Sequence, residues 1–182
     1  MSYNIGADTS LVLWGLTQRV KTVKDALEVE QEHLMNVFGI SHDEFHFVDG
    51  SGGGDSAATT KATIKLLKDM SETKVFDVYK SALPILGVDG SLVFVNEFEK
   101  NEDLKGAKEN VFSKTGTFVE IDDNGSIIIR AQAFAGYIDA KSKRQLSYAL
   151  YVNNVKATNL IDDLVRIFQD EGTISAIIWK EN

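Results

Sequence analysis

The chain has 182 residues, of which 43% are hydrophobic and 25% charged, and its formal net charge is −8 at pH 7. This composition is typical of a globular protein and excludes disorder and collagen-like repeats. The acidic balance gives no basic surface for nucleic acid or an anionic membrane. Because cysteine is absent, a disulfide framework and a thiol nucleophile are excluded. No apolar run has the length of a transmembrane helix, and the start lacks the features of a signal peptide.

The first part of the chain has helical periodicity. Apolar residues recur at helical spacing over 5–20 and again over 23–38, where Gly39 follows as a left-handed stop, so we expect a helical hairpin. The glycine-rich segment 48–56 cannot hold regular structure, and Asp55 or Ser56 is placed to cap a third helix over 57–70. A shorter helix is expected over 75–82, before the proline at position 84.

The second part of the chain changes to a strand pattern. Segments 111–119, 126–138 and 145–152 are rich in β-branched and aromatic residues, which predicts three antiparallel strands. The Asn124-Gly125 pair favours a tight turn between the first two, so a meander is expected. Helical spacing returns over 160–168, and the apolar run 173–179 is interpreted as a short strand that could extend the sheet.

The first predicted strand opens with a sequence that suits recognition of a carboxylate. Alternation places Lys114 and Gly116 on one face, with Thr115 and Thr117 on the other. A cation and a hydroxyl can hold a carboxylate, and a glycine leaves the backbone open to an added peptide. Lys114-Thr115-Gly116 therefore resembles the Lys-Thr-Gly motif of β-lactamases and penicillin-binding proteins.

Other segments extend this resemblance in the same order along the chain. They are Ser2-Tyr3-Asn4, which matches a Ser-x-Asn motif and leads into a helix, then segments 48–52, 83–92, 113–117 and 135–138. The order and spacing resemble the serine-type D-alanyl-D-alanine carboxypeptidases of the penicillin-binding protein and serine β-lactamase superfamily, from residue 2 to about residue 154. The resemblance implies an α+β fold, with helices followed by an antiparallel sheet and a C-terminal helix. It also implies a single domain over residues 1–182, the C-terminal portion of a transpeptidase-like domain.

The resemblance implies a role for each matching residue. Ser2 would relay a proton to the leaving amine and Asn4 would orient the substrate amide. Lys114 and Thr115 would hold the terminal carboxylate of the substrate. Gly116 would leave the strand accessible, and the backbone N–H of Thr117 would contribute to an oxyanion hole.

The nucleophile that the superfamily needs is not in its expected place. A Ser-x-x-Lys motif precedes Ser-x-Asn in that superfamily, whereas here the one Ser-x-x-Lys sequence, Ser71 to Lys74, follows it and is interpreted as a helix cap. We therefore expect this chain to be a portion of a peptidoglycan carboxypeptidase and to be inactive alone.

The resemblance also implies partners. They would be a stem peptide or a β-lactam, and either a missing N-terminal half or a second copy that exchanges strands. The family would place it in the periplasm or cell envelope, without a cofactor.

Other interpretations stay open from the sequence alone. The chain could be a non-catalytic binding module that retains the penicillin-binding fold, or an unrelated domain with chance motifs. A nucleotide site at the glycine-rich loop is disfavoured, because Asp55 stands where a Walker loop carries lysine. The three histidines, His33, His42 and His46, lack the spacing of a metal site and are interpreted as surface or structural residues.

Overall fold

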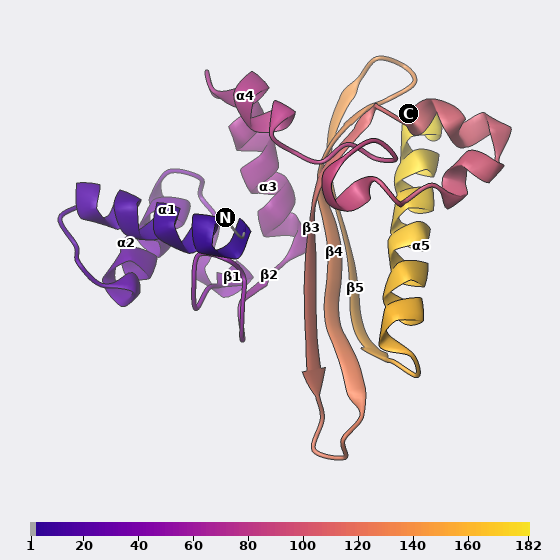
Figure 1. The fold of residues 1–182 in the computed structure, drawn as a ribbon. Helices are drawn as coiled ribbons and strands as arrows, with labels where there is room; N and C mark the ends of the chain where they lie inside the picture. Colours follow the sequence, from indigo (N-terminus) through magenta and orange to yellow (C-terminus); the bar gives the residue numbers. More distant parts are fainter. Residues whose placement is uncertain (1–2) are drawn as a thin grey trace. The chain divides into compact units, whose positions relative to one another are not determined.

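The computed structural model describes the backbone of residues 3–182 and the side chains of residues 5–182. The chain forms two compact units, Met1–Asp69 and Met70–Asn182 (Figure 1). Helices come first and a three-stranded antiparallel sheet with a long helix follows, so the fold is α+β, as the sequence predicts. A single domain over residues 1–182 stays a prediction.

The first unit begins with the predicted helical hairpin. Helix α1 (Tyr3–Thr17) packs against α2 (Val23–Asn36). The two helices approach closely at Gly15, where an added Cβ would lie 2.8 Å from the Cβ of Ala26. Thr22 caps α2 by accepting a hydrogen bond from the backbone N–H of Asp25 at 3.1 Å. Gly39 has a φ of +60°, the left-handed conformation expected after a helix.

The third helix starts later than the sequence predicts. Residues Ala57–Ala58 form a short strand, β2, that pairs with β1 (Phe45–His46) after the 3₁₀ turn η1 (His42–Glu44). Helix α3 (Thr60–Ser71) follows, and Thr59 is its cap, since the Thr59 hydroxyl accepts from the backbone N–H of Ala62 at 3.0 Å. The predicted capping by Asp55 or Ser56 is wrong, because the pairing of Ala57 and Ala58 with β1 takes precedence over helix formation.

The second unit is built on the predicted meander. It contains α4 (Phe76–Ser81), the 3₁₀ turns η2 (Gly90–Leu92), η3 (Glu97–Lys100) and η4 (Glu102–Ala107), and the strands β3 (Val111–Ile121), β4 (Ile127–Asp139) and β5 (Gln145–Lys156). The strands are antiparallel in the order β3-β4-β5. Gly125 lies in the first turn with a φ of +75°. The strands pack closely at Gly136, where an added Cβ would lie 2.0 Å from the carbonyl oxygen of Phe112.

The chain ends in one long helix instead of a helix and a strand. Helix α5 (Leu160–Glu181) lies along one face of the sheet (Figure 1). The strand predicted from the apolar run 173–179 is wrong, because these residues continue the helix. Packing decides the helix, since its buried residues fall at helical spacing and Gly172 allows close contact with Val95. The core between α5 and the sheet consists of Leu86, Leu92, Val95, Phe98, Leu104, Ala107, Val111, Phe134, Ile138, Tyr148 and Ala176.

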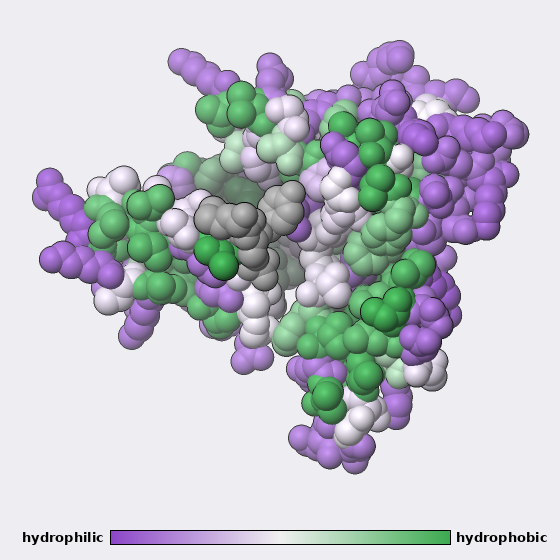
Figure 2. Space-filling view, viewed as in Figure 1, coloured by the Kyte–Doolittle hydropathy of each residue, from purple (hydrophilic) through white to green (hydrophobic). Residues whose placement is uncertain are grey.

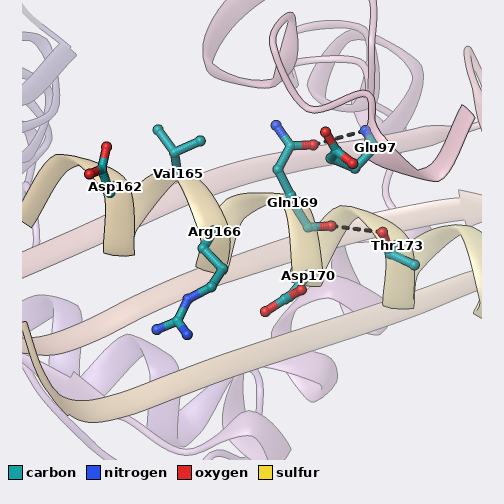
Figure 3. A pocket seen from close by; sticks show the side chains of 7 residues that line it. All are labelled: Glu97, Asp162, Val165, Arg166, Gln169, Asp170 and Thr173. Carbon is teal, nitrogen blue, oxygen red and sulfur yellow. Dashed lines mark hydrogen bonds between the residues drawn. The ribbon is translucent and has the colours of Figure 1, made fainter. Parts of the chain in front are cut away.

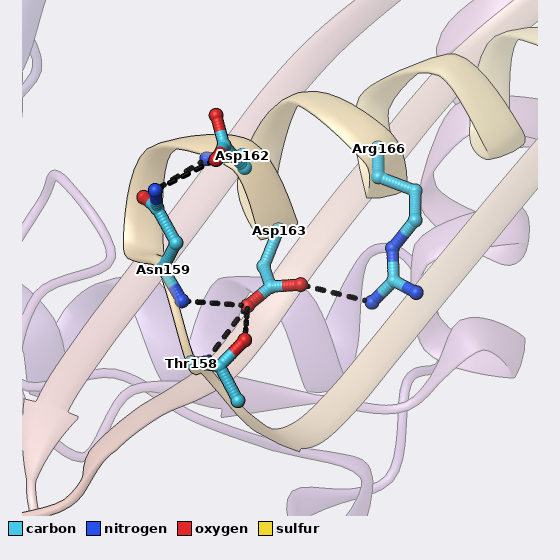
Figure 4. Close-up of polar contacts among 5 residues, drawn as sticks. All are labelled: Thr158, Asn159, Asp162, Asp163 and Arg166. Carbon is cyan, nitrogen blue, oxygen red and sulfur yellow. Dashed lines mark hydrogen bonds and ion pairs between the residues drawn. The ribbon is translucent and has the colours of Figure 1, made fainter.

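Polar contacts fix the start of α5 (Figure 4). The Asn159 side chain accepts from the backbone N–H of Asp162. The Asp163 carboxylate accepts from the backbone N–H groups of Thr158, at 2.9 Å, and Asn159, at 3.2 Å, and it pairs with Arg166. These backbone hydrogen bonds, with the bond from Thr158 acting most strongly, lower the pKa of Asp163. The helix therefore begins at a defined residue directly after β5.

Part of the second unit presents apolar side chains to solvent. Figure 2 shows hydrophobic surface on the lower part of the sheet, just above a hydrophilic turn. Ile121, at the end of β3, is 70% exposed, and Ile161 on α5 is 66% exposed. Among the described residues, no helix is both long and apolar enough to cross a membrane.

Candidate active site

Strand β3 separates the motif residues onto two faces. Ser113 is buried and Thr115 half-buried, whereas Lys114 and Gly116 are exposed. The hydroxyls of Ser113, Thr115 and Thr117 each make a hydrogen bond to a side chain of β5, η2 or β4. Lys114 and Gly116 therefore share the face opposite these hydroxyls, in agreement with the alternation predicted for an extended strand.

The outer edge of β3 carries free backbone groups next to the motif. Near its start, the N–H of Ser113 donates to the carbonyl of Pro84 at 2.9 Å, on the side away from β4. Backbone polar groups of a strand point to the same side at every second residue. The N–H groups of Thr115 and Thr117 therefore point to the same outer edge. Beyond the antiparallel bridge between Ile85 and Phe112 at its start, no strand within residues 70–182 pairs with this edge, so an extended peptide can add to it from Thr115 onward.

Lys114 places its positive charge at this edge. Its Nζ donates to the carbonyl oxygen of Thr115 at 2.5 Å, and that carbonyl shares the outward direction of the Thr115 N–H. Partial burial of the ammonium group lowers the pKa of Lys114, although the side chain as a whole is exposed. At Gly116 an added Cβ would meet no atom within 4 Å. The edge thus combines a cation, outward N–H groups and open space.

Thr115 has a partner that sequence reasoning missed. Its Oγ1 lies 2.9 Å from Oγ of Ser91, which belongs to η2. A hydroxyl is both donor and acceptor, so this bond can reverse its direction. When Ser91 donates to Thr115, the Thr115 hydroxyl proton is available to a carboxylate, which only accepts. Segment 83–92 is part of the family resemblance, but only the fold reveals that Ser91 contacts the motif.

Ser2 and Asn4, the two N-terminal residues of the predicted site, have no described side chains. Ser2 lies outside the described residues. Asn4 belongs to the first turn of α1 in the unit Met1–Asp69, and its side chain is outside the description. The roles of Ser2 and Asn4 therefore stay predictions, as do those of Lys114, Thr115, Gly116 and Thr117.

A hollow elsewhere in the second unit is a poor candidate for the site. It has a volume of about 560 Å³ and lies between η3 and α5 (Figure 3). Its lining includes the carboxylates of Glu97, Asp162 and Asp170 and no residue of the Lys-Thr-Gly motif. Gln169 in this hollow is engaged in structure, since it accepts from the N–H groups of Asn96 and Glu97. The three carboxylates outnumber Arg166, the cation of the lining, which is paired with Asp163, so the hollow disfavours an anionic peptide terminus.

Comparison with known proteins identifies the family. The sequence model of the D-Ala-D-Ala carboxypeptidase 3 (S13) family matches residues 2–170, which is nearly the whole chain. The chain belongs to this family. Membership in the S13 carboxypeptidase family confirms the predicted recognition and excludes chance motifs in an unrelated domain. Among curated proteins, none matches the sequence significantly.

Solved structures support the same fold. The chain is similar to penicillin binding protein 4 of Haemophilus influenzae complexed with a novel β-lactam, with a TM-score of 0.69 and 18% identity over 97% of this chain. A second structure of penicillin binding protein 4 from Haemophilus influenzae gives a TM-score of 0.67 and 18% identity over 92% of this chain. This S13 chain spans only 39% and 36% of those two structures. The predicted penicillin-recognising fold is thus confirmed for the part that this chain covers.

Ser71 does not cap the helix that follows it in this S13 family member. Ser71 is the last residue of α3, and α4 has Val75 at its N-cap position without a side-chain cap, so the predicted capping by Ser71 is wrong. Within residues 3–182, no group of three or more histidine and acidic side chains is arranged to hold a metal ion.

Proposed function

We propose that this chain is part of a serine D-alanyl-D-alanine carboxypeptidase that acts on peptidoglycan stem peptides in the cell envelope or periplasm through an acyl-enzyme. Family membership supports the reaction class. The observation that carries the proposal is the outer edge of β3, where Lys114 and the N–H groups of Thr115 and Thr117 lie together. A peptide that ends in a carboxylate fits such an edge by adding as a strand and pairing its charge with the lysine.

We assign the motif residues roles that follow from their chemistry. Lys114 and the Thr115 hydroxyl hold the terminal carboxylate, with Ser91 donating to Thr115 when substrate is bound. The Thr117 N–H donates to the oxyanion of the tetrahedral intermediate, where negative charge develops. Ser2 relays a proton to the leaving amine and Asn4 orients the substrate amide. A β-lactam, which carries a carboxylate and an acylating carbonyl, is expected at the same edge.

The nucleophile of the proposed reaction comes from outside these residues. An acyl-enzyme needs an activated serine, and the one Ser-x-x-Lys sequence present, Ser71 to Lys74, lies after Ser-x-Asn instead of before it. The chain also spans only about two-fifths of the penicillin binding protein 4 structures that it matches. We therefore propose that a longer protein carries the activated serine and that residues 1–182 are inactive alone.

The sheet offers a place for the remainder of such a protein. Strand β5 is the other edge of the β3-β4-β5 sheet and has no partner strand within residues 70–182. An unpaired strand edge attracts another strand. We propose that β5 pairs with strands of a missing N-terminal half, or with a second copy through strand exchange. The helical conformation of 173–179 rules out the earlier expectation that this segment fills the edge.

We expect no covalent labelling of residues 1–182 by a fluorescent penicillin. The carboxylate clamp and the oxyanion donors cannot form an ester without an activated serine. The measurement is in-gel fluorescence after incubation and denaturation, with the full-length protein as the positive control. A fluorescent band from the short chain would contradict the proposal that it is inactive alone.

Ser91→Ala in the full-length protein should slow acylation by a β-lactam roughly 3- to 10-fold, because Thr115 loses a hydrogen bond of about 1 kcal/mol. The rate is measured as the second-order constant of labelling. Ser142→Ala, in the exposed turn between β4 and β5, is the matched control and should leave the rate unchanged. Equal rates in the Ser91 variant and the wild type would remove Ser91 from the site.

A further inference from the structure

Four polar residues are completely buried in the second unit, between the sheet and α5. They are Ser113 on β3, Gln132 on β4, and Glu171 and Ser175 on α5, each 0% exposed. Within the described part of the chain, neither carboxyl oxygen of Glu171 nor Nε2 of Gln132 has a hydrogen-bond partner. Buried polar groups without partners are rare because they destabilise the fold. The unpartnered groups of Glu171 and Gln132 therefore indicate a role other than stabilising the fold.

Gln132 connects this buried cluster to the surface of the sheet. It lies directly opposite Thr117 in the β3–β4 register, and its Oε1 accepts from the Thr117 hydroxyl at 2.5 Å. Because the carboxamide oxygen is engaged toward Thr117, the NH₂ group projects the other way. The Gln132 side chain is close enough to Glu171 to affect its pKa. A donor and an acceptor without other partners thus lie near each other behind Thr117.

A second branch of contacts joins the same turn of α5 to the other end of the motif. The Ser175 hydroxyl donates to the carbonyl of Glu171 at 2.8 Å, and its oxygen lies 3.4 Å from the Tyr148 hydroxyl oxygen. The Tyr148 hydroxyl in turn bonds with that of Ser113, the residue before Lys114. One turn of α5 therefore supports both ends of the segment from Ser113 to Thr117.

We propose that Glu171 is a positioning residue for the candidate substrate strand, acting on Thr117 through Gln132. In the proposed arrangement the Glu171 carboxyl and the Gln132 NH₂ group, which have no other partners among the described residues, form a hydrogen bond in which Gln132 donates to the Glu171 carboxyl. This bond holds the amide so that its oxygen accepts from Thr117. Thr117 Oγ1 is held against the sheet, and the Thr117 N–H is kept pointing to the outer edge. The importance of this alignment for catalysis rests on the proposed function, whereas the coupling between Glu171 and Thr117 does not.

The surroundings of Glu171 make this coupling measurable. Burial raises the pKa of Glu171 to about 8, while the Gln132 side chain acts in the opposite direction. The other side chains of the cluster that face it are Ser175 on its own helix and Tyr148 on β5, whose pKa burial raises to about 12. Gln132 and Ser175 carry no charge. Within this cluster, ionisation near pH 8 therefore belongs to Glu171, and the coupling would transmit it to Thr117. Lys114 on β3, whose pKa is lowered by partial burial, is the same in the wild type and in Glu171→Gln, so a difference between these two proteins reports Glu171.

The test follows the backbone amide of Thr117 by NMR from pH 5 to 10 in the ¹⁵N-labelled chain. We expect its chemical shift to titrate with a midpoint near 8 in the wild type. The titration should disappear in Glu171→Gln, which cannot ionise, and in Gln132→Leu, which breaks the connection. The amide of Thr115, a residue whose hydroxyl bonds to Ser91 and not to Gln132, is the internal control. A Thr117 amide that does not titrate in the wild type overturns the proposal even if neither variant folds.

Acylation of the full-length protein tests the catalytic part of the proposal separately. We expect the rate of β-lactam labelling to fall above pH 8 in the wild type and this fall to be absent in Glu171→Gln. Identical pH profiles in the two proteins would overturn the positioning role. A wild type that is never labelled would overturn the proposed function and the positioning role with it. The Thr117 titration would still report the coupling, because it needs no acylation.

Discussion

Lys114→Ala in the full-length protein should slow acylation by a β-lactam roughly 30- to 1,000-fold. The lysine is proposed to pair with the carboxylate of the ligand at the outer edge of β3, and loss of one partner of such a charge pair costs about 2–4 kcal/mol. The measurement is the second-order rate of labelling by a fluorescent penicillin. Because the Lys114 side chain is exposed, we expect the variant to keep the stability of the wild type.

Two variants make the Lys114 result specific. Lys141→Ala removes an exposed lysine from the turn after β4 and should leave the rate unchanged, which controls for net charge. Lys114→Arg keeps the charge with a different geometry, so its labelling rate should lie between the rates of Lys114→Ala and the wild type. An unchanged rate in Lys114→Ala would favour a non-catalytic module that retains the penicillin-binding fold, with Lys114 as an ordinary strand residue.

The sheet could be predicted from the sequence because its signals are local. The alternation over β3 and β4 and the Asn124-Gly125 turn fix a hairpin without help from the remainder of the fold. The C-terminal helix could not be predicted to its full length, since Gly172 and the isoleucines after it have low helix propensity. Contact between Gly172 and Val95, which are distant in sequence, decides the helical conformation there.

The candidate site likewise contains residues that the sequence predicts and residues that only the tertiary structure reveals. Lys114, Thr115 and Thr117 could be found because they occupy a short motif, and the alternation of a strand gives their faces. Ser91 and Glu171 could not be found, because a serine in a turn and a glutamate in a helix are ordinary in sequence. Ser91 matters only because η2 lies beside Thr115, and Glu171 only because its helix position faces the sheet. Ser91 and Glu171 can therefore be identified only from tertiary contacts.

Glu171→Gln should make the second unit more stable at neutral and alkaline pH. Burial raises the pKa of Glu171 from an ordinary 4.5 to about 8, against the opposing effect of Gln132. Between these two values the folded protein binds more protons than the unfolded chain, so the free energy of unfolding falls as pH rises, by up to about 1.4 kcal/mol per pH unit. The loss is absent below pH 4.5 and complete above pH 8. Glutamine does not titrate, so the variant avoids this loss.

The measurement is urea unfolding at a series of pH values from 4 to 9, in a Trp14→Phe background so that Trp179 fluorescence reports on the second unit. We expect the difference in unfolding free energy between variant and wild type to grow with pH and to level off above 8, at about 2–5 kcal/mol. Glu72→Gln, an exposed glutamate of the same unit, should show no such growth. A difference that does not depend on pH would mean that Glu171 is already ionised in the folded protein. A pH-dependent gain would mean that the wild type keeps this acid at a cost in stability, which is characteristic of residues retained for function.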